Sequence, residues 1–135
     1  MDNQNTASIE NYAGLLLQIS NLLNSSFEEV KNKFKDYPHS EIYYFEKDKK
    51  DKSIEIRFDE KEIMIICTFN PHEICDCIFL YPDRKETNDE LIIYLGKVYK
   101  YDFLHTVWIT PSYYIKIKKV VQSINDVCFM IIARS

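Results

Sequence analysis

Residues 53–81 constrain the fold more than any other part of the chain. Apolar and polar residues alternate over residues 53–58, and a period of two places successive side chains on opposite faces of a β-strand. The charged residues 59–62 then interrupt the apolar pattern and predict a tight turn. If Glu60 and Lys61 form a two-residue loop, Phe58 pairs with Ile63 in an antiparallel hairpin.

The hairpin gathers its apolar side chains on one face, because residues paired directly across antiparallel strands point to the same side. A slip of one residue would set these side chains against Glu55 and Arg57, so the register is strongly specified. The loop holds neither Asn-Gly nor Asp-Gly, which leaves a longer turn open. The predicted core face consists of Ile54, Ile56, Phe58, Ile63, Ile65, Cys67 and Phe69.

The stretch ends in a further strand. A turn over residues 70–73 is expected because Pro71 fixes φ and lacks an N–H donor. Residues 74–81 are then apolar at every position except Asp76. This pattern predicts a central strand that is covered on both faces.

Helical spacing of apolar residues predicts two helices near the N-terminus. The first spans about residues 8–24. The second follows Ser26, which forms a capping-box pattern with Glu29. Residues 40–46 have the composition of a strand, and the charged residues 47–52 are expected to form a loop. The result is a four-stranded antiparallel meander at 40–46, 53–58, 63–69 and 74–81.

The remainder of the chain is expected to form one helix and then further antiparallel strands. The helix is placed at about residues 88–99, after a second capping box. The lysines of residues 113–118 are typical of an edge strand. The strands are placed at 106–110, 113–118 and 127–133, and the sequence leaves open whether they join the meander. The chain is therefore predicted to be a single α+β domain over residues 1–135, with residues 1–6 disordered.

Composition excludes several functional classes. The net charge of −4 argues against a nucleic-acid partner. No apolar run reaches the roughly 20 residues that a membrane helix needs, so no membrane partner is expected. The first ten residues lack the basic and apolar regions of a signal peptide, and the 4 cysteines lie in strand-like runs. We therefore expect a cytoplasmic protein with reduced thiols.

The sequence contains no recognisable catalytic, metal-binding or cofactor-binding motif. His72, Cys75 and Cys77 have a spacing that structural zinc sites do not use, and a second pair of ligands is missing. Carboxylates cluster at residues 59–62 and 86–90, where a solvated turn and a helix start account for them. We expect a non-enzymatic protein without a cofactor.

The sheet face opposite the predicted core is the main candidate for a binding site. It carries Ile42, Tyr44, Met64, Ile66 and Thr68, with Glu55 and Arg57 among them. This face is too apolar for full solvation and too polar for a deep core. Either a helix covers it, or it is an apolar patch that binds a partner.

The layout of a helix, then S-S-F-E-E-V-K-N-K-F at residues 25–34, then an antiparallel meander resembles small cytosolic immunity proteins of bacterial toxin–immunity systems. The resemblance implies a non-enzymatic, acidic protein that neutralises a cognate toxin by tight binding. Acidic residues would steer a basic toxin into contact. The candidate protein-binding residues are Tyr44, Asp48, Asp51, Glu55, Arg57, Asp59, Glu60, Met64, Ile66 and Tyr114.

Two alternatives remain open. The first is a small-molecule-binding or enzymatic domain, with a pocket between helices and sheet that is lined by tyrosines, Trp108 and His105. The second is an inhibitor of a host defence protein, encoded by a phage or plasmid. The sequence specifies neither the partner nor the oligomeric state.

Overall fold

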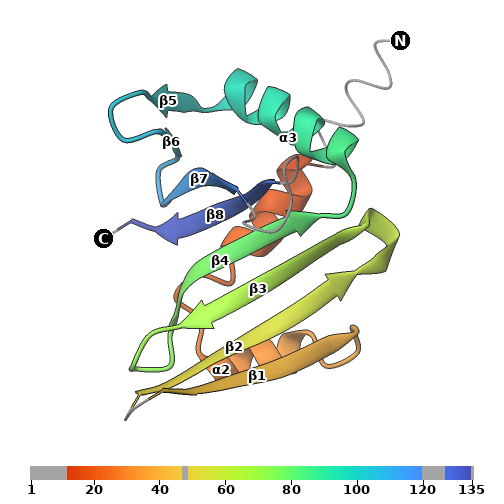
Figure 1. Cartoon of the computed structure of the whole chain (residues 1–135), viewed down its shortest axis with the longest axis vertical. Coiled ribbons are helices and arrows are strands. Elements are labelled where there is room, and N and C mark those ends of the chain that lie inside the picture. The colour runs from red at the N-terminus through yellow and green to blue at the C-terminus, as the bar shows by residue number, and fades with distance from the viewer. Residues whose placement is uncertain (1–11, 47–48, 120–126, 135) are drawn as a thin grey trace.

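The chain folds into one twisted antiparallel sheet with helices on one side (Figure 1). The computed structural model describes residues 12–46, 49–119 and 127–134, with the backbone alone for residues 43–46 and 49–51. A helix includes residues 12–20 and precedes α2 (Phe27–Lys33). The other elements are β1 (His39–Glu46), β2 (Lys49–Phe58), the 3₁₀ turn η1 (Asp59–Lys61), β3 (Ile63–Phe69), β4 (Cys75–Pro82), α3 (Lys85–Val98), β5 (Lys100–Asp102), β6 (Val107–Ile109), β7 (Tyr113–Lys119) and β8 (Val127–Ala133).

The C-terminal strands extend the same sheet as the N-terminal meander. The eight strands lie in the order β1-β2-β3-β4-β8-β7-β6-β5. The last strand, β8, therefore fills the centre of the sheet, where it pairs with β4 on one side and β7 on the other. The α+β class and the meander are confirmed, and the open question about the C-terminal strands is resolved in favour of a single sheet.

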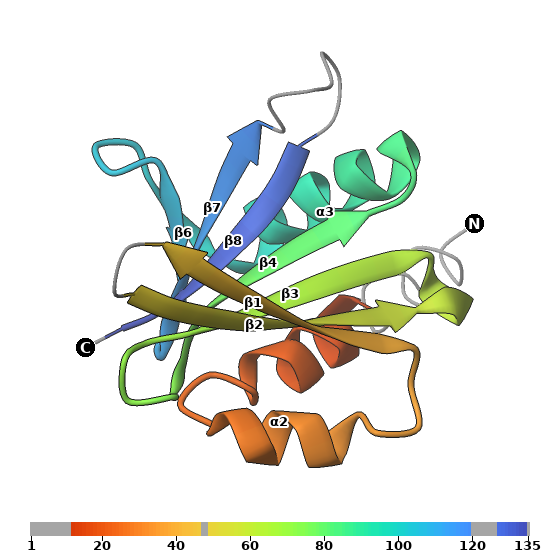
Figure 2. The ribbon, with the colours of Figure 1, turned by 60° about the horizontal axis from the view of Figure 1, so that its bottom comes forward.

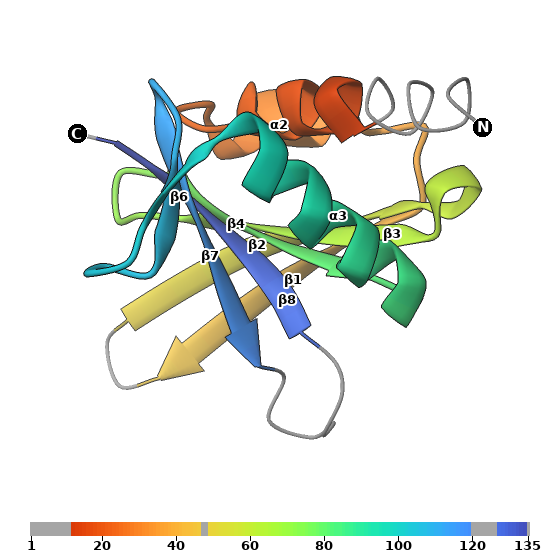
Figure 3. The ribbon, with the colours of Figure 1, turned by 90° about the horizontal axis from the view of Figure 1, so that it is seen from above.

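The helices pack on one face of this sheet (Figures 2 and 3). Phe34, at the end of α2, makes an edge-to-face contact with Phe58 of β2 at a centroid distance of 5.8 Å. Tyr12 of the first helix contacts the ring of Tyr94 in α3 at 5.9 Å, and its hydroxyl donates to Glu90 at 2.5 Å. Side chains from all three helices and from β2, β3, β4, β6, β7 and β8 thus form one hydrophobic core.

The central hairpin has the predicted register. Phe58 pairs with Ile63, Ile56 with Ile65 and Ile54 with Cys67. All seven predicted core-face side chains of this hairpin are buried. The loop has four residues instead of two, because η1 is followed by Glu62 in the left-handed conformation with φ of 53°. This longer loop is consistent with a sequence that has no Asn-Gly or Asp-Gly pair.

Several strand predictions were wrong at their boundaries. Residues 49–52 belong to β2, although their charges predicted a loop, because they pair with residues 43–46 of β1. The short strand β5 was missed, since three residues are too few to show alternation. The lysines of β7 do not mark an edge, because this strand lies between β6 and β8; the two edges are β1 and β5.

The two capping-box predictions had different outcomes. At α2 the box is formed: Ser26 Oγ accepts from the Glu29 N–H, and Glu29 Oε1 accepts from the Ser26 N–H, both at 3.1 Å. At α3 the box is not used, because the helix begins at Lys85 with Arg84 as its N-cap. The predicted start at residue 88 was therefore three residues too late. The predicted disorder of residues 1–6 lies outside the described residues.

The cap of α2 gives a first testable prediction. Ser26→Ala removes one acceptor for the first turn and is expected to lower the free energy of unfolding by about 1 kcal/mol. The neighbouring Ser25→Ala removes only a 3.5 Å contact to the carbonyl of Asn21 and serves as the matched control. Urea unfolding of both variants should show the larger loss for Ser26→Ala. Equal losses would contradict a role for the capping box.

Candidate functional site

The face of the sheet that points away from the helices is called here the second face. Its centre is an apolar strip formed by Met64 and Ile66 of β3, Phe79 and Tyr81 of β4, and Met130 and Ile132 of β8. All six side chains are only half-buried. No helix in the described ranges packs on them, because these helices contribute to the core on the opposite face (Figure 3).

Strand register places the strip residues side by side. Ile66 pairs with Phe79, and Phe79 pairs with Met130, so these three form a row across three strands. Met64 pairs with Tyr81 in the next row. The rings of Phe79 and Tyr81 stack at a centroid distance of 6.5 Å. The strip is therefore continuous across the middle of the sheet.

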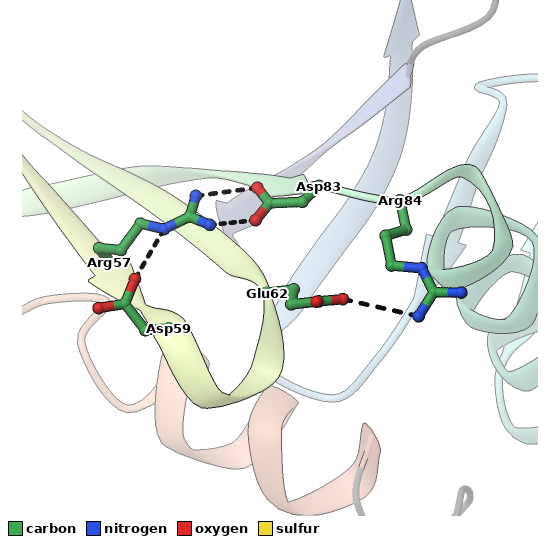
Figure 4. Close-up of polar contacts among 5 residues, drawn as sticks. All are labelled: Arg57, Asp59, Glu62, Asp83 and Arg84. Atoms are coloured by element: carbon green, nitrogen blue, oxygen red, sulfur yellow. Dashed lines mark hydrogen bonds and ion pairs between the residues drawn. The ribbon is translucent and has the colours of Figure 1, made fainter.

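Arg57 bounds the strip on the β2 side (Figure 4). Its guanidinium donates two hydrogen bonds to the carboxylate of Asp83, one of them at 2.8 Å, and a third at 3.0 Å to Asp59. Arg57 thereby links the end of β2 to the segment that follows β4. Glu55 lies on the same face of β2, one row further along the strand.

Two of the acidic candidates, Asp59 and Glu60, lie at the end of the hairpin and away from the strip. Asp59 and Glu60 belong to the exposed turn η1 at the end of the hairpin, where Asp59 is held by Arg57. Nearby, Glu62 lies 3.7 Å from Arg84 (Figure 4). The structure thus brings Glu55, Arg57, Met64 and Ile66 together on one face and places Asp59 and Glu60 at its end. The candidates Tyr44, Asp48 and Asp51 lie outside the residues whose side chains are described.

Lysines bound the strip on the β7 side. Lys116 pairs with Met130, and Lys118 pairs with Cys128, so both share the second face with the strip. Among the described residues neither lysine forms an ion pair. Tyr114 lies on the same face of β7, and the guanidinium of Arg134 stands 5.1 Å from its ring centroid.

The strip continues into a groove beside the β5–β6 hairpin. This groove has a volume of about 330 Å³. It is lined by Val107 and Ile109 of β6, Tyr114 of β7, Ile132 of β8, Asp102 of β5 and His105 of the loop that follows β5. The groove is a concave and predominantly apolar part of the second face.

The β5–β6 loop presents two apolar side chains to solvent. Phe103 is 86% exposed and Leu104 is 85% exposed. Asp102 orders this loop, because its carboxylate accepts from the backbone N–H groups of Leu104 at 2.9 Å and His105 at 3.2 Å. His105 Nδ1 lies 2.7 Å from the same carboxylate, and this contact is the main cause that lowers the pKa of Asp102. The loop therefore holds exposed apolar groups in an ordered conformation.

Cys67, Cys77 and Cys128 are poorly suited to act as nucleophiles. Burial raises the pKa of Cys77 to about 11 and also raises that of Cys128. The neighbouring thiol of Cys75, together with burial, raises the pKa of Cys67. A nucleophilic cysteine needs a lowered pKa. Within the described part of the chain, no three His, Cys, Asp or Glu side chains converge as ligands for a metal ion.

Of the residues named for the alternative pocket, His105 and one tyrosine, Tyr114, line the groove, whereas Trp108 does not. Trp108 is 5% exposed and belongs to the core. His105 lies on the exposed loop after β5 and contacts Asp102. Trp108 therefore packs in the core, whereas His105 belongs to a surface loop.

None of the helices in the described ranges has the length and apolarity of a membrane-spanning helix.

Sequence reasoning missed half of the second face. Residues 74–81 were expected to be covered on both faces because they are apolar throughout. The strand is central, but no described helix covers Phe79 and Tyr81. The exposed pair Phe103 and Leu104 was also missed; its signal is an apolar pair in a short segment between Asp102 and His105.

Comparison of the chain with known protein families, curated proteins and solved structures gives no significant match.

Proposed function

We propose that this protein is a non-enzymatic binding module that holds a protein partner against the second face of its sheet. The apolar strip carries this proposal. Its six side chains lie side by side on three neighbouring strands, and the described helices all pack on the other face. Continuous apolar patches of this kind are typical of interaction sites.

The composition of the strip and its borders also supports a protein partner. Phe79, Tyr81 and the two methionines are large, partly exposed side chains, and aromatic residues and methionine are enriched at protein interfaces. Arg57 and Lys116 border the strip on opposite sides. An apolar centre with a polar rim is the usual composition of such an interface.

Within this class we propose an inhibitor role, in which the protein neutralises a toxin by direct binding, as an immunity protein does. The support for this role is the resemblance in layout and the net charge of −4. Exposed carboxylates around η1, including Glu60, would accelerate association with a basic toxin and orient it toward the end of the sheet.

The test combines capture with inhibition. Tagged protein is incubated with lysate of the source cells, washed at high salt, and its bound proteins are identified by mass spectrometry. We expect one partner in stoichiometric amount whose own activity is lost when one equivalent of this protein is added. A captured partner that stays fully active would contradict the inhibitor role, and no partner above background would contradict protein binding.

A further inference from the structure

We propose that the groove beside the β5–β6 hairpin binds an acidic segment of the protein partner, anchored by one bulky apolar side chain. This inference rests on the proposed function, because it assigns the partner's chemistry at one end of the second face. Two independent features carry it: the apolar lining of the groove and the positive charge of its rim.

The groove has room for one large apolar side chain. Its volume is about 330 Å³, and its walls are Val107, Ile109, Tyr114 and Ile132. An apolar protein cavity of about 150 Å³ is large enough to bind benzene. A leucine or phenylalanine side chain of the partner therefore fits, with space for part of the adjoining backbone.

Three cations lie next to residues of this lining, on β5, on β7 and just after β8. Lys100 pairs with Ile109 and so shares its face, and Lys116 follows Tyr114 on the same face of β7. The guanidinium of Arg134 stands over the ring of Tyr114 and donates to the carbonyl of Thr110 at 2.6 Å. This contact fixes one positive charge at the rim.

The carboxylate at the groove is already engaged by its own loop. Asp102 accepts from two backbone N–H groups and contacts the ring of His105. The groove is thus rimmed by positive charge in a chain whose net charge is −4. The acidic turn η1 lies at the opposite end of the strands from the β5–β6 hairpin (Figure 1). A bound segment with negative charges on either side of an apolar anchor matches both the lining and the rim.

Three synthetic peptides test this assignment. The first has four aspartates around one central leucine, the second has four lysines around the same leucine, and the third has four aspartates around a central glycine. Binding is followed by amide chemical shifts in ¹H–¹⁵N NMR spectra of the whole protein. We expect the acidic leucine peptide to shift the signals of residues 107–109 and 132, and the other two peptides to bind much more weakly.

A charge reversal checks the rim. Lys116→Glu should weaken binding of the acidic leucine peptide roughly five- to tenfold, because an attractive charge becomes a repulsive one. Lys35→Glu makes the same change of net charge at an exposed position just after α2, on the helical side of the sheet, and should leave the affinity nearly unchanged.

Four results would overturn the inference. Equal binding of the acidic and basic peptides would remove the charge argument, and equal binding of the leucine and glycine peptides would remove the anchor. Self-association of the protein that Lys116→Glu abolishes would identify a second copy as the occupant. If the peptides fail while the captured partner still binds the protein, the groove assignment is wrong and the proposed function stands.

Discussion

Replacing Phe129 with alanine is expected to lower the free energy of unfolding by about 3–5 kcal/mol. Phe129 is fully buried and lies on β8, the strand that joins the meander to the C-terminal strands. It pairs with Leu80 of β4 and with Ile117 of β7. Its removal leaves a cavity where the two halves of the sheet meet, and neighbouring strands cannot close it without losing their pairing. Guanidinium unfolding followed by circular dichroism measures the loss.

Met130→Ala is the matched control, because Met130 is the next residue along the same strand and points to the second face. Met130 is half-buried and no described helix packs on it, so this substitution should lower the free energy of unfolding by only about 1 kcal/mol. A loss at Met130 as large as that at Phe129 would show that the second face is interior. A small loss at both positions would contradict the central placement of β8.

Replacing Met64 with glutamate is expected to weaken partner binding by at least about 30-fold, which corresponds to the roughly 2 kcal/mol that defines an interface hot spot. Met64 lies in the apolar strip between Arg57 and Tyr81. A carboxylate there would lose its water on binding without gaining a matched group from the partner protein. The fold should persist, because the free variant keeps the new charge solvated and beside the guanidinium of Arg57. Titration calorimetry with the captured partner measures the affinity.

Met64→Leu separates charge from shape. It keeps the apolar character and nearly the same volume, so both affinity and stability should change little. Thermal unfolding of the glutamate variant decides between two explanations for lost binding. If this variant unfolds, Met64 is interior and the binding proposal fails. If it folds and binds as the wild type does, the strip lies outside the interface.

The sequence predicted the local elements of this fold best where one face is buried. The alternation around Ile56 and Ile65 sets the register of the central hairpin, because the wrong register would bury Glu55. The capping box at Ser26 was also visible, since both of its partners lie within one turn. At Thr87 the same pattern failed, which shows that a cap motif indicates a helix start without fixing its residue.

The sequence did not predict the order of strands. Strand β8 is apolar on both faces, and this pattern indicates a central position without naming its neighbours. The lysines of β7 suggested an edge strand. The same alternating pattern of lysines also occurs in a central strand when no helix packs on its outward face. Strand β5 is too short for any period to appear.

The second face was predicted only in part, because a strand that is apolar on both faces does not reveal which face is left uncovered. Residues of β2 and β3 were assigned to it because their polar neighbours reveal the alternation. Phe79 and Met130 lie on strands without polar neighbours, so the apolar pattern alone favoured a covered position. The groove required the neighbours of β6 and β7, which only the three-dimensional structure supplies.

The most direct test of the central claim is the rate at which hydrogen peroxide oxidises Met64 and Met130, measured by mass spectrometry for the free protein and for its complex with the captured partner. Both methionines belong to the apolar strip and are half-buried. Oxidation of methionine follows its accessibility to the oxidant. We predict that both are oxidised readily in the free protein and are protected together in the complex. Equal oxidation with and without the partner, or resistance already in the free protein, would contradict the claim that this face is the binding surface.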